Sequence, residues 1–198
     1  YGLSETSPSA SCNPTNSKAF TGTIGVPLPG TYFKLLNDEG HEAPPGHAGE
    51  IAIKGPQVMA GYWQRPDETD KVMTPDGYFK TGDVGIIDDN GFFKIIDRKK
   101  DMVLVSGFNV YPNEIEDVVA KLDGVLECAC VGVLDEKSGE AVKLVIVKKN
   151  PDLTEAQVRA YCKENLTGYK QPKVVEFRTE LPKTPVGKIL RRELRDKR

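Results

Sequence analysis

The stretch at residues 76–101, DGYFKTGDVGIIDDNGFFKIIDRKKD, divides the chain into two parts with different patterns of apolar residues. It contains an Asp-Asn-Gly turn at residues 89–91 between two apolar runs, and a short turn of this kind strongly favours a β-hairpin. Five charged residues, 97–101, follow the hairpin. Because few contacts cross such a polar connector, the sequence predicts a domain boundary within residues 97–102.

The part before the connector is predicted to be β-rich. From residue 21 to residue 61, short apolar runs such as TYFKLL and EIAIK alternate with turns that contain Gly and Pro. This alternation is typical of a small antiparallel sheet or barrel.

The part after the connector has the pattern of a compact α+β unit of about 100 residues. Four segments favour strands: MVLV, VLECACVGV, AVKLVIVKK and VVEF. A helix is predicted to start at Pro112, because the apolar residues that follow recur on one helical face. These residues are Ile115, Val118, Val119 and Leu122. Thr154 followed by Gln157 is a capping-box pattern, which predicts the start of a second helix. The predicted fold class is α+β.

Composition excludes several classes of protein. The chain is 38% hydrophobic and 28% charged, as in ordinary globular proteins. No apolar stretch approaches the ~20 residues that a membrane-spanning helix needs. Two of the four cysteines are isolated and two alternate on one predicted strand, which argues against an oxidising compartment and favours the cytoplasm. The only histidines, His41 and His47, lie in a turn region, and there is no CxxC pair, so a zinc site is not expected.

Charge is divided unevenly between the two parts. Residues 1–97 hold 7 Lys and Arg against 13 Asp and Glu, whereas residues 98–198 hold 20 against 16, so the second part is expected to meet anions. Its most basic segment is the tail, with Lys188, Arg191, Arg192, Arg195, Lys197 and Arg198. Three interpretations of the tail stay open: a solvated C-terminal helix, an amphipathic helix at a lipid surface that also uses Ile189, Leu190 and Leu194, and an apolar stripe of these three residues that packs on its own domain. Nucleic acid is not an expected partner, because the basic segment lacks interleaved aromatic residues.

The segment YGLSE combines four kinds of side chain within five residues. A purine can stack on the Tyr1 ring, Gly2 adds flexibility, and Ser4 can donate to a phosphate. Glu5 can take Mg²⁺, a hard cation that prefers oxygen ligands. A turn that carries a surface acid is the alternative interpretation of this spacing.

Three other residues suggest anion or nucleotide chemistry. The two oxygens of the Asp83 carboxylate match a cis-diol such as that of ribose. Arg98 keeps its charge and has several donors for ribose or phosphate oxygens, with a surface ion pair as the alternative. The loop PKTPVGK presents Lys188, whose ammonium can stabilise charge that grows on a phosphate during displacement, with a solvated side chain as the alternative.

Five segments occur together in a fixed order: YGLSE, GEIAIKGPQVMAGYW, FKTGD, DRKKDMVLVSGFNVYPNEIE and PKTPVGKILRREL. In this order and at these spacings they resemble the acyl-adenylate-forming superfamily, and in particular the bacterial long-chain fatty acid–CoA ligases (acyl-CoA synthetases). The resemblance implies the β-rich C-terminal part of a large AMP-binding domain at residues 1–97, a hinge at 98–101 and a small mobile α+β domain at 102–198. It also implies that the chain is a fragment, inactive or nearly so alone, because the family's upstream phosphate loop and most of its acyl-chain wall are absent.

The resemblance further implies ATP, Mg²⁺ and CoA as cofactor and co-substrates, and a long-chain fatty acid as substrate. It implies a nucleotide site in which Tyr1 stacks on adenine beside Gly2, Ser4 touches phosphate, Glu5 holds Mg²⁺, and Asp83 binds the ribose diol with Arg98 beside it. Ser4 replaces the more usual Thr of the family and keeps its hydroxyl.

For the second domain, the resemblance implies a catalytic Lys188 that bridges the fatty carboxylate and the α-phosphate. A rotation about the hinge then withdraws Lys188 and brings in the strand edge at Gly107, where pantetheine passes close to the backbone. Leu104 stands where many relatives have Lys, so no ligand role is expected there.

Two alternatives remain open. The shorter motifs are shared with luciferases, aryl-CoA ligases and peptide-synthetase adenylation domains, so an adenylating enzyme for an aryl acid or a carrier-protein acceptor is the first. A non-catalytic α+β binding module with a basic tail is the second. Peripheral membrane contact is a further expectation for a fatty acid enzyme, and no oligomeric state follows from the sequence.

Overall fold

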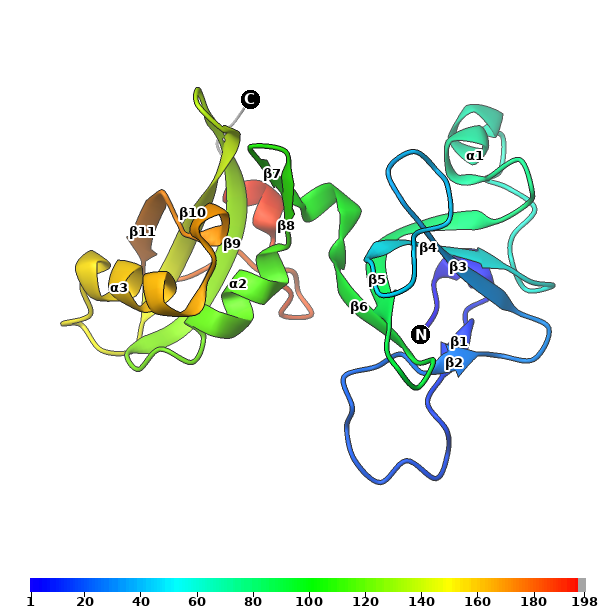
Figure 1. Ribbon diagram of the computed structural model, residues 1–198, viewed down its shortest axis with the longest axis horizontal. Helices are drawn as coiled ribbons and strands as arrows, with labels where there is room; N and C mark the ends of the chain where they lie inside the picture. Colours follow the sequence, from blue (N-terminus) through cyan, green and yellow to red (C-terminus); the bar gives the residue numbers. More distant parts are fainter. Residues whose placement is uncertain (196–198) are drawn as a thin grey trace. The chain divides into compact units, whose positions relative to one another are not determined.

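The computed structural model describes residues 1–195 and divides into two compact units (Figure 1). The first unit is Tyr1–Lys99, and the second unit starts at Lys100. Within residues 1–195, no helix is both long and apolar enough to cross a membrane.

The first unit is built on a four-stranded antiparallel sheet in the order β3-β4-β5-β6. The strands are β3 (Tyr32–Leu36), β4 (Gly49–Lys54), β5 (Phe79–Ile87) and β6 (Phe93–Arg98). The smaller elements are the 3₁₀ turn η1 (Ser4–Thr6), the paired strands β1 (Ser11–Cys12) and β2 (Val26–Pro27), and helix α1 (Pro66–Val72). Alternate residues of β4, including Ile51 and Ile53, are fully buried against Leu35 and Phe93, which gives this unit its core.

The hairpin predicted at residues 89–91 is confirmed between β5 and β6. The Asp88 carboxylate accepts hydrogen bonds from the backbone N–H groups of Asn90 and Phe92, both at 2.9 Å. Gly91 has a φ of 82°, a left-handed conformation that glycine adopts without a Cβ clash. The turn sets the pairing as far as Gly85 with Ile95, and a shift of register between Val84 and Gly85 then places Asp83 opposite Arg98.

The second unit is a five-stranded mixed sheet with two helices. Its strands are β7 (Val103–Val105), β8 (Phe108–Val110), β9 (Val125–Asp135), β10 (Gly139–Lys148) and β11 (Val174–Arg178). The order is β11-β10-β7-β8, with β9 paired to β10. The helices are α2 (Pro112–Val119) and α3 (Glu155–Asn165), and the short 3₁₀ turns are η2 (Lys99–Asp101), η3 (Gly168–Lys170) and η4 (Arg191–Glu193).

Both faces of this sheet are covered. Cys128 and Cys130 of β9 face the main core, which α2 and α3 complete, whereas Ala129 and Val131 face a second cluster that includes Leu194 (Figure 1). This alternation follows from the two-residue period of a strand. Because both faces are buried, β9 and β10 appear in the sequence as continuous apolar runs.

The predicted α+β class is confirmed by this architecture and by the solved structures described below. The predicted strands and the helix at Pro112 are present, and Ile115 and Val119 are fully buried. The capping box is present as well, because the Thr154 side chain accepts a hydrogen bond from the Gln157 backbone N–H.

Neither helical interpretation of the basic tail holds for the described residues. Only the three-residue turn η4 forms. The alternative that the apolar stripe packs on its own domain is confirmed for Leu194, which is 1% exposed, and for Ile189, which packs against the same cluster. Arg191 is mostly buried and ion-paired. Lys197 and Arg198, which the tail prediction included, lie outside the described residues.

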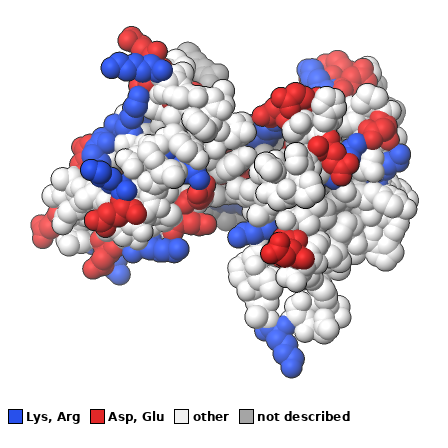
Figure 2. Space-filling model, in the orientation of Figure 1, with Lys and Arg blue, Asp and Glu red and all other residues white. Residues whose placement is uncertain are grey.

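Many basic groups of the second unit lie beside acids, and Figure 2 shows acidic side chains among the basic ones. Three such ion pairs are Lys170 with Glu114, Lys173 with Asp135 and Lys183 with Glu127, each shorter than 3 Å. The excess of basic residues therefore does not form one continuous basic surface on the face shown.

Candidate functional site

The candidate site of the first unit is centred on Asp83, which is only 3% exposed. Its Oδ1 is 2.9 Å from Arg98 Nε, and its Oδ2 accepts a hydrogen bond of 2.6 Å from the Tyr1 hydroxyl. Burial, followed by this bond to the carboxylate, raises the pKa of Tyr1 far above its ordinary value, so the hydroxyl remains a donor. Because each carboxylate oxygen has two lone pairs, Asp83 keeps acceptor capacity for a ligand.

Glu50 of β4 supports the backbone next to Asp83. Its Oε1 accepts a hydrogen bond of 3.1 Å from the N–H of Gly82, and its Oε2 is 3.0 Å from Lys99 Nζ. The Thr81 hydroxyl accepts a hydrogen bond of 3.1 Å from the Asp83 N–H. Sequence analysis did not single out Glu50, because its partners are distant in the chain and no local spacing signals them.

The turn η1 places Glu5 beside Tyr62. Glu5 Oε1 accepts a hydrogen bond of 2.9 Å from the Tyr62 hydroxyl. Burial and then the Glu5 carboxylate raise the pKa of Tyr62, so this hydroxyl also stays protonated. Ser4 is exposed at the start of the turn. Tyr62 lies within the AGYW segment, but the sequence alone does not indicate that it contacts Glu5.

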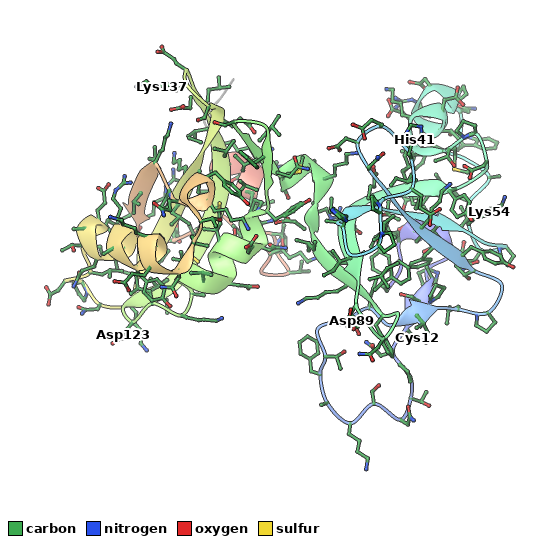
Figure 3. All side chains as sticks on the ribbon, viewed as in Figure 1. Cys12, His41, Lys54, Asp89, Asp123 and Lys137 are labelled. Atoms are coloured by element: carbon green, nitrogen blue, oxygen red, sulfur yellow. The ribbon has the colours of Figure 1, made fainter. Side chains whose placement is uncertain are left out.

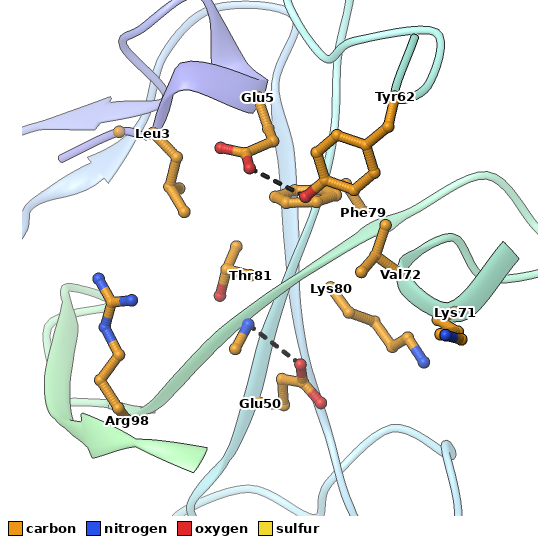
Figure 4. A pocket seen from close by; sticks show the side chains of 12 residues that line it. Leu3, Glu5, Glu50, Tyr62, Lys71, Val72, Phe79, Lys80, Thr81 and Arg98 are labelled. Carbon is orange, nitrogen blue, oxygen red and sulfur yellow. Dashed lines mark hydrogen bonds between the residues drawn. The ribbon is translucent and has the colours of Figure 1, made fainter. Parts of the chain in front are cut away.

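Beside Asp83 is a pocket of about 480 Å³, shown in Figure 4, whose lining includes Thr81, Gly82 and Arg98. Glu5 and Tyr62 line one side of it, and Arg98 and Glu50 line another. Arg98 has a side chain that is 53% exposed, so its remaining donors can reach a ligand while Nε holds Asp83. The arrangement offers fixed acceptors and the cationic side chains of Arg98, Lys71 and Lys80 around a polar cavity.

Gly2 also lines this pocket, and its position leaves no room for a side chain. A Cβ added there would lie 1.6 Å from the carbonyl oxygen of Pro8. We therefore expect Gly2→Ala to lower the free energy of unfolding by about 1–3 kcal/mol, because the backbone around η1 must move. Urea denaturation checks this, with Gly168→Ala as the control, since nothing lies within 4 Å of a Cβ at Gly168. Equal stability of the two variants would contradict the expectation.

Lys188 lies in a tight loop of the second unit. Its N–H donates to the Thr184 hydroxyl at 3.1 Å, and its carbonyl accepts from the Thr184 N–H at 2.8 Å. Gly187 has a φ of 82°, which closes the loop and leaves Lys188 exposed. Within residues 1–195, no acidic group pairs with the Lys188 ammonium, so it is available to an external anion.

Gly107 lies in the hairpin turn between β7 and β8. Ser106 and Gly107 both have positive φ, at 51° and 84°, and nothing lies within 4 Å of a Cβ at Gly107. Beside this edge is a pocket of about 500 Å³ whose lining includes Lys137, Arg159 and Lys173. Figure 3 shows Lys137 at the end of the β9–β10 hairpin. Lys173 is ion-paired with Asp135 and Arg159 with Glu155, whereas the Lys137 ammonium is suited to bind a phosphate.

Several of the site residues predicted from the sequence lie close together in the structure. Tyr1, Asp83 and Arg98 are in direct contact, and Gly2, Glu5 and Arg98 line one pocket. Ser4 lies beside Glu5 on η1, and Gly107 and Lys188 belong to the second unit.

Comparison with known proteins places this architecture in a family. A model described as "AMP-binding enzyme" matches residues 1–63, and one described as "AMP-binding enzyme C-terminal domain" matches residues 114–188. Among solved structures, ATP-bound MatB from Rhodopseudomonas palustris has a TM-score of 0.91 and 39% identity, over 98% of this chain and 39% of its own. The o-succinylbenzoate CoA synthetase MenE from Bacillus subtilis, in complex with its acyl-adenylate intermediate, has a TM-score of 0.86 and 34% identity, over 100% of this chain and 40% of its own. The chain belongs to the AMP-binding, or acyl-adenylate-forming, enzyme family.

Within that family, the chain is most informatively compared with long-chain-fatty-acid–CoA ligases. The ligase of Escherichia coli O6:H1 is 59% identical over 99% of this chain, and that of Bacillus subtilis (strain 168) is 46% identical over 98%. The chain spans 35% of the length of each of these relatives.

Proposed function

We propose that this chain is part of a longer AMP-forming long-chain fatty acid–CoA ligase of lipid metabolism, to which it contributes the ribose-binding carboxylate and the catalytic lysine. The observation that carries the proposal is the buried Asp83 carboxylate, held between Tyr1 and Arg98, where Arg98 and Gly82, the residue before Asp83, line a polar pocket. The identity to long-chain-fatty-acid–CoA ligases over nearly the whole chain supports the fatty acyl substrate.

In the proposed nucleotide site, Asp83 accepts hydrogen bonds from the two ribose hydroxyls through its remaining lone pairs. Arg98 contacts ribose or phosphate oxygens with its free donors, and the Tyr1 ring stacks on adenine. Ser4 is exposed and can donate to a phosphate oxygen.

Glu5 is the proposed Mg²⁺ ligand. A single carboxylate suits this ion, which usually keeps several waters and binds substrate phosphates as well. In the described part of the chain, no three His, Cys, Asp or Glu residues gather as a metal cluster, so phosphate and water oxygens would supply most of the other ligands. Bound Mg²⁺ would neutralise negative charge on the phosphates. The hydrogen bond from Tyr62 fixes the orientation of the Glu5 side chain.

In the first proposed step, a carboxylate oxygen of the fatty acid attacks the α-phosphorus of ATP. The bond between that phosphorus and the oxygen bridging to the β-phosphate breaks, and pyrophosphate leaves with the electron pair. Lys188 places its ammonium between the fatty carboxylate and the α-phosphate, where it offsets the charge that grows in the transition state.

In the second proposed step, the sulfur of CoA attacks the acyl carbon and loses its proton to solvent. The bond from the acyl carbon to the AMP oxygen breaks, which gives acyl-CoA and AMP. The strand edge at Gly107 admits pantetheine, and Lys137 of the neighbouring pocket offers a cation to the phosphates of CoA.

Residues 98–101 are the proposed hinge between a domain at 1–97 and a domain at 102–198. The division of the chain into compact units at Lys99 and Lys100 supports this proposal. Rotation about such a hinge lets one active site expel pyrophosphate in the first step and admit the thiol in the second. A cytoplasmic location is part of the proposal, supported by the absence of disulfides among the four cysteines. Peripheral membrane contact is the route we propose for capturing a substrate that partitions into bilayers.

An aryl acid is the second candidate substrate, because a feruloyl-CoA synthase from Amycolatopsis sp is 43% identical over 88% of this chain. The test compares pyrophosphate release from ATP with oleate and with ferulate, in a full-length ligase that carries this chain. We expect release that depends on oleate and is accelerated by CoA. Release with ferulate and not with oleate would overturn the fatty acyl assignment while keeping the adenylating chemistry.

A further inference from the structure

The loop that presents Lys188 is anchored at both ends. Leu181 precedes it and Leu194 follows it, and both are buried in the same cluster on one face of the β9–β10 pair. The Leu190 N–H donates to the Pro182 carbonyl at 2.8 Å, which closes the base of the loop. The loop backbone therefore has a fixed starting point and a fixed end on the sheet.

Arg191, three residues after Lys188, holds the end of this loop through contacts of its side chain. Its Nε is 3.0 Å from Glu116 Oε1 and its Nη2 is 2.6 Å from Glu116 Oε2, the two-pronged geometry that makes Arg–carboxylate pairs strong. Nη2 also donates to Asn113 Oδ1. Both partners lie on helix α2, and Glu116 Oε1 accepts a further hydrogen bond of 2.7 Å from the Cys130 N–H of β9.

The same cluster reaches the residues that directly follow the unit boundary. Arg191 Nη1 is 3.7 Å from Asp101 Oδ2, and Arg195 Nη2 is 2.8 Å from Asp101 Oδ1 and 3.0 Å from the Lys100 carbonyl. The side chains of Arg191, Glu116 and Asp101 are each less than one-fifth exposed. Arg191 thus joins helix α2 to the base of the Lys188 loop, and together with Arg195 it joins both to the start of the second unit.

We propose that Arg191 is a positioning residue for Lys188: it locks the loop to α2 and to Asp101, so that the ammonium moves as one body with the start of the second unit. The inference rests on the proposed function. Lys188 has a flexible four-carbon stem and no ion-pair partner within residues 1–195, so the loop alone sets where its ammonium can reach. A misplacement of about 1 Å at a reacting group can cost about 100-fold in rate.

The test compares Arg191→Gln with Arg192→Gln in a full-length ligase that carries this chain. Arg192 is the neighbouring residue and loses the same charge, but it is exposed and outside the cluster. We expect Arg191→Gln to slow oleoyl-adenylate formation by about 100-fold, and to leave the conversion of supplied oleoyl-adenylate to oleoyl-CoA within about threefold. Arg192→Gln should leave both half-reactions within about threefold. Arg191→Lys should recover only part of the loss, since an ammonium cannot form the two-pronged contact.

A second measurement reports on the anchor without using activity. Hydrogen exchange at the backbone amides of Thr184, Gly187, Lys188 and Leu190, all hydrogen-bonded here, should become about tenfold faster in Arg191→Gln, whereas the amides of α3 should keep their rates. Unchanged exchange in the loop would overturn the inference. Equal loss of both half-reactions, with faster exchange throughout the second unit, would overturn it too, because it indicates a general structural role. A wild-type enzyme without oleate-dependent pyrophosphate release would instead overturn the proposed function, and the positioning role with it.

Discussion

Replacing Lys188 with alanine is expected to reduce adenylate formation by about 1,000-fold, the size of effect seen when one group that stabilises transition-state charge is removed. The loop is held by backbone hydrogen bonds and by the Thr184 hydroxyl, none of which needs the Lys188 side chain. The variant should therefore fold normally. Conversion of supplied oleoyl-adenylate and CoA to oleoyl-CoA should stay within about threefold, because the proposed rotation withdraws Lys188 before that step.

The matched control is Lys183→Ala, which removes a lysine from the same loop. Lys183 forms an exposed ion pair with Glu127 at 2.6 Å, and such pairs contribute little to stability. Both half-reactions should be preserved in this variant. If Lys188→Ala slowed the two half-reactions equally, this would contradict the proposal that the second unit presents Lys188 in the first step and the Gly107 edge in the second.

The second large effect is expected for Asp83→Asn, which should lower kcat/KM for ATP by about 100-fold. Hydrogen bonds to a charged group contribute about 1.5–3 kcal/mol, and the amide offers a single acceptor oxygen where the carboxylate has two. The variant also removes the ion pair with Arg98. Asp89→Asn is the matched control, because Asp89 is an exposed acid at the tip of the same hairpin (Figure 3).

A comparison of ATP with 2′-deoxy-ATP distinguishes a loss of ribose binding from a general loss of structure. If Asp83 binds the ribose hydroxyls, the wild-type enzyme should prefer ATP to 2′-deoxy-ATP, and Asp83→Asn should lose most of that preference. The KM for oleate should stay the same. A variant that keeps the full preference while losing activity would show that Asp83 supports the fold and does not bind ribose.

The fold was predictable where the deciding interactions are local. The hairpin follows from an Asp-Asn-Gly turn whose hydrogen bonds span four residues, and the start of α3 follows from the reciprocal bonds of Thr154 and Gln157. Helix α1 was missed because none of its residues is buried, so it carries no apolar periodicity. A helix was wrongly predicted for the tail, although the packing of its apolar stripe on the domain was foreseen, because the burial of Leu194 depends on a sheet face formed 47 to 65 residues earlier in the chain.

The same distinction between local and long-range interactions decides which residues of the candidate site could be predicted. Residues inside recognisable motifs, such as Asp83 and Lys188, could be singled out from the sequence. Their supports could not, because Glu50 contacts Gly82 across the sheet and Arg191 meets Glu116 across 75 residues of chain. Such partners become visible only once the strands and helices are in place.

The most direct test of the proposed adenylating function follows oxygen atoms from substrate to product. A full-length ligase that carries this chain is given ATP, Mg²⁺, CoA and oleate labelled with ¹⁸O in its carboxylate, and the AMP is analysed by mass spectrometry. Attack of the carboxylate on the α-phosphorus, followed by cleavage of the bond between the acyl carbon and the oxygen, transfers one labelled oxygen to each AMP. AMP with one ¹⁸O is the predicted result. Unlabelled AMP, or formation of ADP in place of AMP, would contradict the account.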